Sequence, residues 1–471
     1  MKNINSIKFK KVLLLSLALI ITLGCERDLS DDAAEATFST LGEIFVEGPI
    51  GMGVNFYFPY LGSKNDALDF NGTNAFESNT SMRIDVPNAD DPTGNYAGAI
   101  LRIDGAGRDL SGYDALTFYA RASQGVTLDA IGFGEDFIEN KYQTTITNLS
   151  IGTGWAKYII PIPDPSKLVE ERGMLRYSAG TQNTGGFGYT IWLDEVRFEN
   201  LGTLAQPQPR ILNGEDVVVQ GFTNIDAILS GFSQTFNGPN GQNITVETTS
   251  AYFDFESSDE SVATVDENGL ITTLGPGTVT ITGSINGVLA EGSLTLNISG
   301  PFEFAPTPPA RDPGDVISIF SNAYENVPVD YYNGFFAPFQ TTLGGSPPLN
   351  INGDDIILYT DLNFVGVGTF LNVAPVNISG MTHLHIDIRP AENIDPGDYM
   401  NIQLLNDVGG NETSGTVGFD SSNFAQDQWT SLDIPIADFG LGDVTQIGLL
   451  FFISDATISN VYVDNIYYYS E

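Results

Sequence analysis

The chain has 471 residues, a formal net charge of -40, one cysteine and two histidines. Such an acidic balance repels nucleic-acid phosphates and anionic lipid headgroups, so binding to either through charge is excluded. It favours neutral ligands and calcium. A lone cysteine excludes intrachain disulfides and cysteine-based zinc sites.

The first residues predict export from the cytoplasm. Four lysines precede an apolar run, residues 12–21, which ends at Gly24-Cys25. The run is too short for a comfortable bilayer span, so residues 1–24 are predicted to be a secretory signal. A small residue followed by cysteine resembles the bacterial lipobox, which implies that Cys25 is lipidated and becomes the mature N-terminus. The alternative is an ordinary signal peptide with an incidental cysteine.

Residues 25–37 form an acidic tether after the predicted cleavage site. Its beginning, residues 26–32, resembles the signal that sends Bacteroidota lipoproteins to the outer face of the outer membrane. Removal of residues 1–24 deletes four lysines and no acid, which takes the net charge from -40 to -44. The resemblance implies a cell-surface protein held in the outer membrane by its lipid anchor.

The rest of the chain predicts an all-β protein of about three domains. Short alternating runs such as 116–120 and 279–282 are separated by clusters of Gly, Asn, Asp and Pro. This pattern is typical of β-sandwiches.

An internal repeat appears when residues 38–200 are laid over residues 314–470. Three blocks match in the same order: 110–121 with 378–389, 155–162 with 429–436, and 191–196 with 461–466. These blocks resemble the jelly-roll, galactose-binding-like carbohydrate-binding modules of polysaccharide-degrading bacteria. The resemblance implies two such sandwiches, at residues 38–204 and 312–471.

The segment between the repeats, residues 209–298, has a different pattern. Residues 255–265 and 275–281 closely resemble the group 2 bacterial immunoglobulin-like domain, which usually acts as a spacer. Proline-rich junctions at 206–209 and 306–309 flank it and are expected to stiffen the links.

No catalytic constellation is found, and no catalytic residue is nominated. His383 and His385 lie two apart on an expected strand, but zinc normally needs three or four protein ligands, so a packed or surface pair is expected. The E-x-D-x-x-E strand of sandwich-fold β-glucanases is absent. A glycoside hydrolase would need two suitably spaced carboxylates, and nothing marks out such a pair.

Structural Ca²⁺ is a partner that the resemblance to carbohydrate-binding modules implies. In those modules an Asp on the closing strand and an acid near the start of the module join backbone carbonyls around the ion. Asp194 and Asp464 occupy the closing-strand position, and Glu47 and Glu325 are the expected partners. Asn322 and Asn465 could add amide oxygens. The alternative is that these acids are solvated turn residues.

A sugar ligand calls for aromatic rings that stack on pyranose faces, beside groups that bind hydroxyls. Trp155 and Trp429 recur at equivalent positions and are expected in the core, whereas Trp192 could lie on the sheet surface or in a site. Aromatic residues of Gly-, Asn- or Pro-rich loops are better candidates. In the C-terminal module they are Tyr331, Tyr332, Phe335, Phe336, Tyr359 and Phe364, beside Asn333, Asp361 and Asn363. In the N-terminal module they are Tyr57, Tyr60, Phe133, Phe137 and Tyr142, beside Glu135, Asp136 and Asn140.

The whole arrangement resembles the surface glycan-binding lipoproteins of Bacteroidota polysaccharide-utilisation systems. That resemblance implies a non-catalytic, monomeric protein that captures polysaccharide beside a TonB-dependent glycan transporter and its partner binding protein. A neutral β-glucan such as laminarin is the first ligand to test. The alternatives are a calcium-stabilised adhesion or structural surface protein and a glycoside hydrolase.

Overall fold

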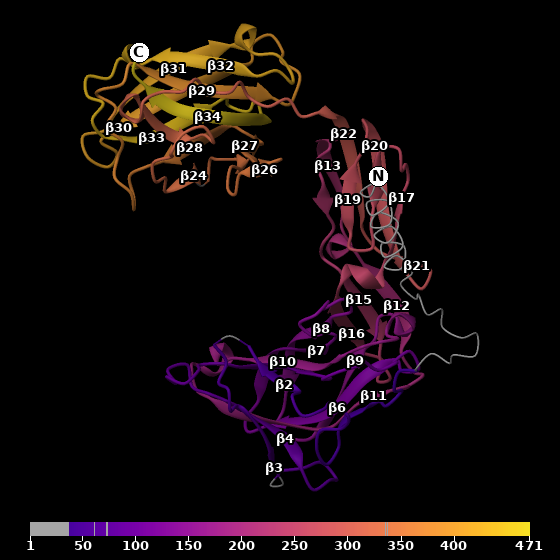
Figure 1. Cartoon of the computed structure of the whole chain (residues 1–471). Coiled ribbons are helices and arrows are strands. Elements are labelled where there is room, and N and C mark those ends of the chain that lie inside the picture. Colours follow the sequence, from indigo (N-terminus) through magenta and orange to yellow (C-terminus); the bar gives the residue numbers. More distant parts are fainter. Residues whose placement is uncertain (1–36, 61, 72–73, 335, 337) are drawn as a thin grey trace, which may run out of the picture.

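A computed structural model describes residues 37–60, 62–71, 74–334, 336 and 338–471. The expected signal segment, Cys25, the tether up to residue 36 and Phe335 lie outside the described residues. The chain forms three successive β-structured parts, as the sequence predicts (Figure 1). None of the helices in the described ranges is long and apolar enough to cross a membrane.

The N-terminal module is a sandwich of two antiparallel sheets. The first has the order β3-β4-β11-β6-β9, with β1 added beside β11. The second has the order β12-β15-β16-β8-β7-β10-β5-β2, in which β15 and β16 come from the middle segment of the chain. Residues of the central strands, such as Phe118 of β6 and Tyr177 of β10, are fully buried between the sheets. The strands of the first sheet are β1 (Glu43–Phe45), β3 (Leu68–Asn71), β4 (Ser81–Val86), β6 (Ala115–Ala122), β9 (Ala156–Pro161) and β11 (Tyr189–Glu199); those of the second are β2 (Tyr57–Pro59), β5 (Ala97–Arg102), β7 (Val126–Phe133), β8 (Thr144–Ile151), β10 (Gly173–Ala179), β12 (Ala205–Arg210), β15 (Ser233–Asn237) and β16 (Asn243–Thr248).

The middle segment packs two smaller sheets around its own core, which includes Ile271, Val279 and Leu296. One sheet has the order β13-β22-β20-β17, with β21 beside β20, and the other has the order β14-β19-β18. The strands are β13 (Asp216–Thr223), β14 (Ala227–Ile228), β17 (Asp254–Ser257), β18 (Ala263–Val265), β19 (Leu270–Thr273), β20 (Gly277–Ile285), β21 (Val288–Leu289) and β22 (Ser293–Pro301).

The C-terminal module repeats the sandwich arrangement. A seven-stranded sheet has the path β25-β27-β34-β29-β32, with β23 beside β34 and β26 beside β27, and a five-stranded sheet has the order β24-β28-β33-β30-β31. The strands are β23 (Val316–Phe320), β24 (Tyr331–Gly334), β25 (Leu343–Gly344), β26 (Leu349–Ile351), β27 (Asp354–Thr360), β28 (Phe364–Gly368), β29 (His383–Pro390), β30 (Tyr399–Asn406), β31 (Thr413–Asp420), β32 (Thr430–Pro435), β33 (Ile447–Ile453) and β34 (Val461–Tyr469). Short 3-10 helices lie at Pro165–Lys167, Gln182–Thr184, Leu212–Gly214, Ser250–Tyr252, Pro313–Asp315, Ser421–Asn423 and Ile436–Phe439.

The two modules share a bulge in the closing strand. Glu195 in β11 and Asn465 in β34 both have a positive φ, near 50°. Each directly follows an aspartate, and its backbone N–H donates to the carboxylate of Asp194 or Asp464. The matching bulge gives structural support to the equivalence of these two aspartates.

The middle segment is joined to the N-terminal module by continuous backbone pairing, and we call this junction the first joint. Its hairpin β15–β16 extends the second sheet, because β16 pairs with β8. Val246 of β16 is fully buried in the core of the N-terminal module. Tyr252 is also fully buried; its hydroxyl donates to the carbonyl of Tyr142 at 3.0 Å and accepts from Thr144 at 3.1 Å.

A second, aromatic joint links the middle segment to the C-terminal module. Phe222 and Phe302 pack against Tyr462 of β34. The guanidinium of Arg389 lies 4.9 to 5.5 Å from the three ring centroids. Trp429, which was expected in the module core, is instead partly exposed beside this joint, where its indole N–H donates to the carbonyl of Glu303. The core expectation was therefore wrong for Trp429, and also for Trp155, which is only partly buried and packs beside Phe76.

Substitution of Tyr252 by Phe should weaken the first joint. The change keeps the ring but leaves the carbonyl of Tyr142 and the hydroxyl of Thr144 without this buried partner, at a cost of about 1–3 kcal/mol. Denaturant unfolding of the whole chain should show the loss. Tyr158→Phe is the matched control, because its hydroxyl donates to the carbonyl of Ser150 near solvent and should cost less. Equal stability losses for the two variants would contradict the role of Tyr252.

Candidate glycan-binding faces

The five-stranded sheet of the C-terminal module carries a group of aromatic rings on its outer face. In β33, Leu450 and Phe452 enter the core, whereas Phe451 lies on the opposite face and is half-buried. The ring centroids of Phe336 and Phe364 lie 5.5 and 6.4 Å from that of Phe451, and 6.3 Å from each other. We call these three rings and the neighbouring Tyr331 the aromatic patch.

Glycines beneath the rings explain how closely the aromatic patch lies on the sheet. A methyl group on Gly366 would meet the rings of Phe451 and Phe336 at 3.0 and 3.1 Å. A methyl group on Gly368 would meet the ring of Tyr331 at 2.4 Å. Strand glycines therefore provide the space in which these rings rest on the backbone.

Polar side chains continue the same face beyond the aromatic patch. The strand register places Gly366, Phe451, Gln403 and Thr416 on one line across β28, β33, β30 and β31. The amide of Gln403 donates to the hydroxyl of Thr416 at 2.8 Å. The face thus combines apolar rings with uncharged hydrogen-bonding groups, the pairing that recognition of a neutral sugar requires.

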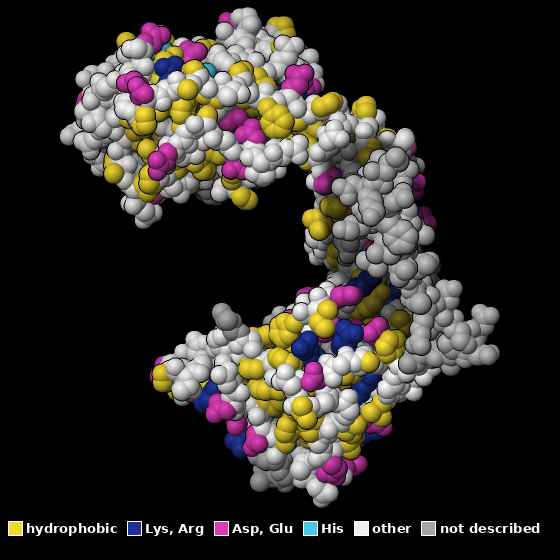
Figure 2. Space-filling model, viewed as in Figure 1, with side chains coloured by type: hydrophobic (Ala, Val, Ile, Leu, Met, Phe, Trp, Pro, Cys, Tyr) yellow, Lys and Arg dark blue, Asp and Glu magenta, His cyan; other side chains and the backbone are white. Residues whose placement is uncertain are grey.

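The corresponding sheet of the N-terminal module has a mixed outer face. Arg176 occupies the position in β10 that Phe451 occupies in β33, between two core residues. It pairs with Glu135 at 3.0 Å, and its Nε donates to the hydroxyl of Tyr60 at 3.2 Å. Figure 2 shows hydrophobic and basic side chains gathered together on this module.

At one end of this N-terminal face, Phe58 packs edge-on against Phe137 with 6.0 Å between ring centroids. Arg102 lies over Phe58 at 4.6 Å and donates to the carbonyl of Asp136. Phe137 is 51% exposed, so its ring is available to a ligand. This end therefore offers a partly exposed ring close to a cationic guanidinium.

In the N-terminal module, the structure places only some of the predicted sugar-binding residues on the outer face of the sheet. Tyr60, Phe137 and Glu135 lie on the outer face, while Asp136 and Asn140 hold the turn that carries Phe137. The remaining candidates lie elsewhere. Phe133 is fully buried, Tyr57 packs against the core, Tyr142 packs against Tyr252 at the first joint, and Trp192 lies on the outer side of the other sheet beside Arg121.

The C-terminal candidates separate in the same way. Tyr331, Phe336 and Phe364 form the aromatic patch together with Phe451. Tyr359 is fully buried and donates to the carbonyl of Tyr332, whose own ring packs against the core. The amide of Asn333 and the carbonyl of Asp361 bind the neighbouring loop, and Asn363 bonds the carbonyl of Phe339.

Sequence reasoning missed Phe451, Gln403, Phe58, Arg176 and the 78% exposed Phe339. The first four lie within strands, whereas the hypothesis from sequence places the binding residues in loops. Strand alternation is the signal that could have found Phe451, since its two neighbours are both core residues.

The metal candidates are brought together in only one module. Glu47 and Asp194 bind the same loop: Asp194 accepts from Phe76 and Ser78, and Glu47 accepts from Asn79. In the C-terminal module, Asp464 lines a pocket with Asp354, Asn322 and Asn465, whereas Glu325 lines a different pocket beside Arg311. Among the described residues, no group of three or more His, Cys, Asp or Glu side chains is placed to hold a metal ion.

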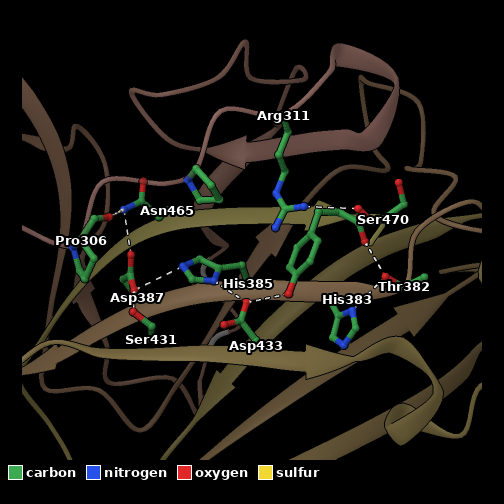
Figure 3. A network of polar contacts seen from close by, with 12 residues as sticks. Pro306, Arg311, Thr382, His383, His385, Asp387, Ser431, Asp433, Asn465 and Ser470 are labelled. Atoms are coloured by element: carbon green, nitrogen blue, oxygen red, sulfur yellow. Dashed lines mark hydrogen bonds and ion pairs between the residues drawn. The ribbon is translucent and has the colours of Figure 1, made fainter.

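Both histidines belong to a network of polar contacts on the outer face of the seven-stranded sheet (Figure 3), and each of them stacks on a tyrosine. His383 stacks on Tyr469 and His385 on Tyr467, with ring centroids 5.1 and 4.7 Å apart. Arg311, from the segment after the middle domain, covers Tyr469 at 3.8 Å. The pair is packed, as the sequence analysis expects, and this face is partly covered by the chain's own linker.

Two carboxylates flank His385. Its Nδ1 lies 2.8 Å from Asp433 and its Nε2 lies 3.4 Å from Asp387. Burial by itself lowers the pKa of His385, but the hydrogen bonds and charges of the two aspartates outweigh it and raise that pKa. Tyr469 also donates to Asp433 at 3.0 Å, so the network joins β29, β32 and β34.

One family model matches a part of the middle segment. The family described as "Intimin, immunoglobulin-like domain" matches residues 247–286, which confirms the immunoglobulin-like character expected for the middle segment. No curated protein matches the chain.

Similar solved structures are carbohydrate-binding modules. A family 30 module is 19% identical, covering 34% of this chain and 86% of its own, with a TM-score of 0.26. A mutant of a family 29 module complexed with cellulohexaose is 11% identical, covering 32% and 89%, with a TM-score of 0.22. The family 11 module of a Clostridium thermocellum cellulosomal cellulase is 13% identical, covering 31% and 97%, with a TM-score of 0.21.

The stability of the chain should depend on pH through His385. Because its pKa is raised in the folded state, the protonated form stabilises the fold below the ordinary pKa of histidine, and this contribution is lost as pH rises through the folded pKa. The wild type should therefore have a higher free energy of unfolding than His385→Gln at low pH, and this difference should become smaller as pH rises. Denaturant unfolding of both proteins at a series of pH values measures this difference. Asp433→Asn should also reduce the pH-dependent stabilisation, because it removes one of the two carboxylates that raise the pKa of His385. A difference independent of pH would contradict the prediction.

Proposed function

We propose that this chain is a non-catalytic glycan-binding lipoprotein of the cell surface. The aromatic patch is the single observation that carries the proposal. Phe336, Phe364 and Phe451 form a half-exposed apolar surface within reach of the amide of Gln403 and the hydroxyl of Thr416. Rings of this kind bind the apolar faces of pyranoses, while neighbouring amides and hydroxyls bind the sugar hydroxyls.

The rings are held before any ligand arrives. They contact one another and rest on strand glycines, so little side-chain freedom remains to be lost on binding. Pre-organisation of this type improves affinity because the entropy cost of ordering the site has already been met in folding. A shallow face of this kind suits a polymer that extends beyond it.

The N-terminal face, with Tyr60, Phe137 and Arg176, is proposed as a second binding face. Two faces on one chain gain avidity for a repetitive polymer, because the second contact takes place at high effective concentration. This advantage exists even when each face binds weakly.

The cellular setting of the proposal comes from the sequence. Lipidation at Cys25 would hold the chain in the outer membrane, and the acidic tether would place it on the outer surface. There the monomeric protein would deliver polysaccharide to a TonB-dependent glycan transporter and its partner binding protein. Laminarin, a neutral β-glucan, is the first ligand to test because the aromatic patch offers no charge.

A calcium-stabilised adhesion or structural protein is the rival proposal, and a glycoside hydrolase is the second. Calorimetric titration of the soluble chain with laminarin, mixed-linkage glucan, xylan, mannan and alginate, with and without EDTA, separates them. Saturable heat with one neutral glucan and no new reducing ends supports glycan binding. Absence of heat across the series with calcium present supports adhesion, and new reducing ends support hydrolysis.

Removal of the ring at the centre of the aromatic patch should weaken glycan binding. Phe451→Ala deletes a contact worth about 1.5–3 kcal/mol when such a side chain is fully covered, so the affinity for the bound glucan should fall about tenfold or more. Titration calorimetry measures the change. Phe187→Ala is the control, since Phe187 is 72% exposed before β11 and lies outside both faces. Unchanged affinity in Phe451→Ala would remove the aromatic patch from the proposal.

We also propose structural Ca²⁺ beside Asp464. This carboxyl is only 3% exposed, and its pocket is also lined by Asp354 and the amides of Asn322 and Asn465. Burial raises its pKa to about 7, aided by the charges of the nearby aspartates and opposed by the N–H of Asn465. Burial of the ionised Asp464 carboxylate is unfavourable without a compensating cation, and an oxygen-rich pocket suits Ca²⁺. The ion would be held by Asp464, Asp354, the amides of Asn322 and Asn465, and backbone carbonyls.

Calcium should therefore raise the unfolding temperature of the wild-type chain, and EDTA should reverse the rise. Asp464→Asn should abolish the effect in the C-terminal module, while Glu325→Gln should preserve it, because Glu325 lines another pocket. Differential scanning calorimetry checks both variants. An equal response to calcium in Asp464→Asn and the wild type would contradict the proposed site.

A further inference from the structure

The outer face of the N-terminal module does not end at the edge of the module. Register pairs define one line that crosses its sheet: Phe58 of β2, Ile100 of β5, Arg176 of β10, Gly132 of β7 and Thr145 of β8. The line continues through Glu247 of β16 to Ser233 of β15. Its last two members belong to the middle segment.

We propose that the β15–β16 hairpin of the middle segment is part of the glycan-binding face of the N-terminal module. Thr245 and Glu247 would contact the same neutral polysaccharide chain that lies over Tyr60 and Phe137. This inference rests on the proposed function, because it assigns further contacts to one of the two proposed binding faces.

The inner side of the hairpin fixes its position. Val246 is fully buried in the core of the N-terminal module, and Thr248 pairs with Thr144 of β8. The buried Tyr252, four residues further along the chain, binds Tyr142 and Thr144. A hairpin anchored in this way joins the face without an ordering cost when a ligand binds.

The outer side of the hairpin has the chemistry that sugar hydroxyls require. Thr245 and Glu247 are exposed and alternate with the buried Val246. The hydroxyl of Thr147 in β8 donates to Glu247 at 3.1 Å, and the hydroxyls of Thr245 and Thr235 lie 2.8 Å apart. Hydroxyl and carboxylate groups thus continue from the module onto the hairpin, where they can donate to and accept from a polyol.

The extension affects long ligands and not short ones. Neighbouring strands lie about 4.8 Å apart, so the two hairpin strands lengthen the face by roughly 10 Å beyond β8. A short oligosaccharide bound at the ring end, near Phe58 and Phe137, would not reach the hairpin. A polymer laid along the line would contact both parts of the face.

The test uses the full soluble chain carrying Phe451→Ala, so that binding reports the N-terminal module. In this background Thr245→Arg places a long side chain on the exposed side of the hairpin. We expect it to lower the affinity for polymeric laminarin about tenfold and to leave that for laminaritriose unchanged. Thr278→Arg, at an exposed threonine of β20 in the same segment, is the matched control and should alter neither affinity.

Other results overturn the inference in distinguishable ways. If Thr245→Arg behaves as Thr278→Arg does while Tyr60→Ala abolishes binding, the N-terminal face binds glycan without the hairpin, and the proposed function survives. If the chain with Phe451→Ala binds neither ligand while the wild type does, only the C-terminal module binds, and the hairpin has no such role. If the wild type also fails to bind, the proposed function itself is wrong.

Discussion

The alternation of side chains along a β-strand is the constraint on which the candidate faces depend. Each sandwich sheet must bury one face, so every second residue is committed to the core. In β33 this rule sends Phe452 inward and leaves the chemically similar Phe451 on the outer face. Side-chain direction, rather than residue type, therefore separates the rings that hold the fold together from those that can bind a ligand.

The two modules use the same architecture for different surface chemistry. At the matching position of the central strand, one module carries Arg176 and the other carries Phe451. Arg176 brings Glu135 and Tyr60 into a partly charged arrangement, whereas Phe451 completes an uncharged group of rings. A duplicated sandwich can diverge in this way because outer residues of a strand change without disturbing the core.

The sequence was sufficient for the fold class and for some of the residues on the candidate faces. The repeat and the alternating runs predicted two sandwiches around an immunoglobulin-like segment, and the loop aromatics included Phe336, Phe364 and Phe137, which the structure places on the candidate faces. Tyr359 and Phe133 were misplaced because a tyrosine or phenylalanine near a loop has the same local pattern whether it faces inward or outward. Phe451 was missed because residues 447–453 are almost uniformly apolar, which hides the alternation.

The hairpin β15–β16 could not have been assigned to the N-terminal sheet from sequence. Its pairing with β8 joins residues about a hundred positions apart, and no local signal specifies such a partner.

Because of this pairing, the middle segment holds the N-terminal module in a fixed orientation as well as separating the two modules. Proline-rich links alone would stiffen the connections without fixing the orientation of the modules. Here Val246 and Tyr252 fix one junction, and the rings of Phe222, Phe302 and Tyr462 fix the other. Under the proposed function, two faces held by buried joints would meet a polymer with little orientational freedom left to lose, so the fixed spacing would contribute to avidity as directly as the contacts themselves.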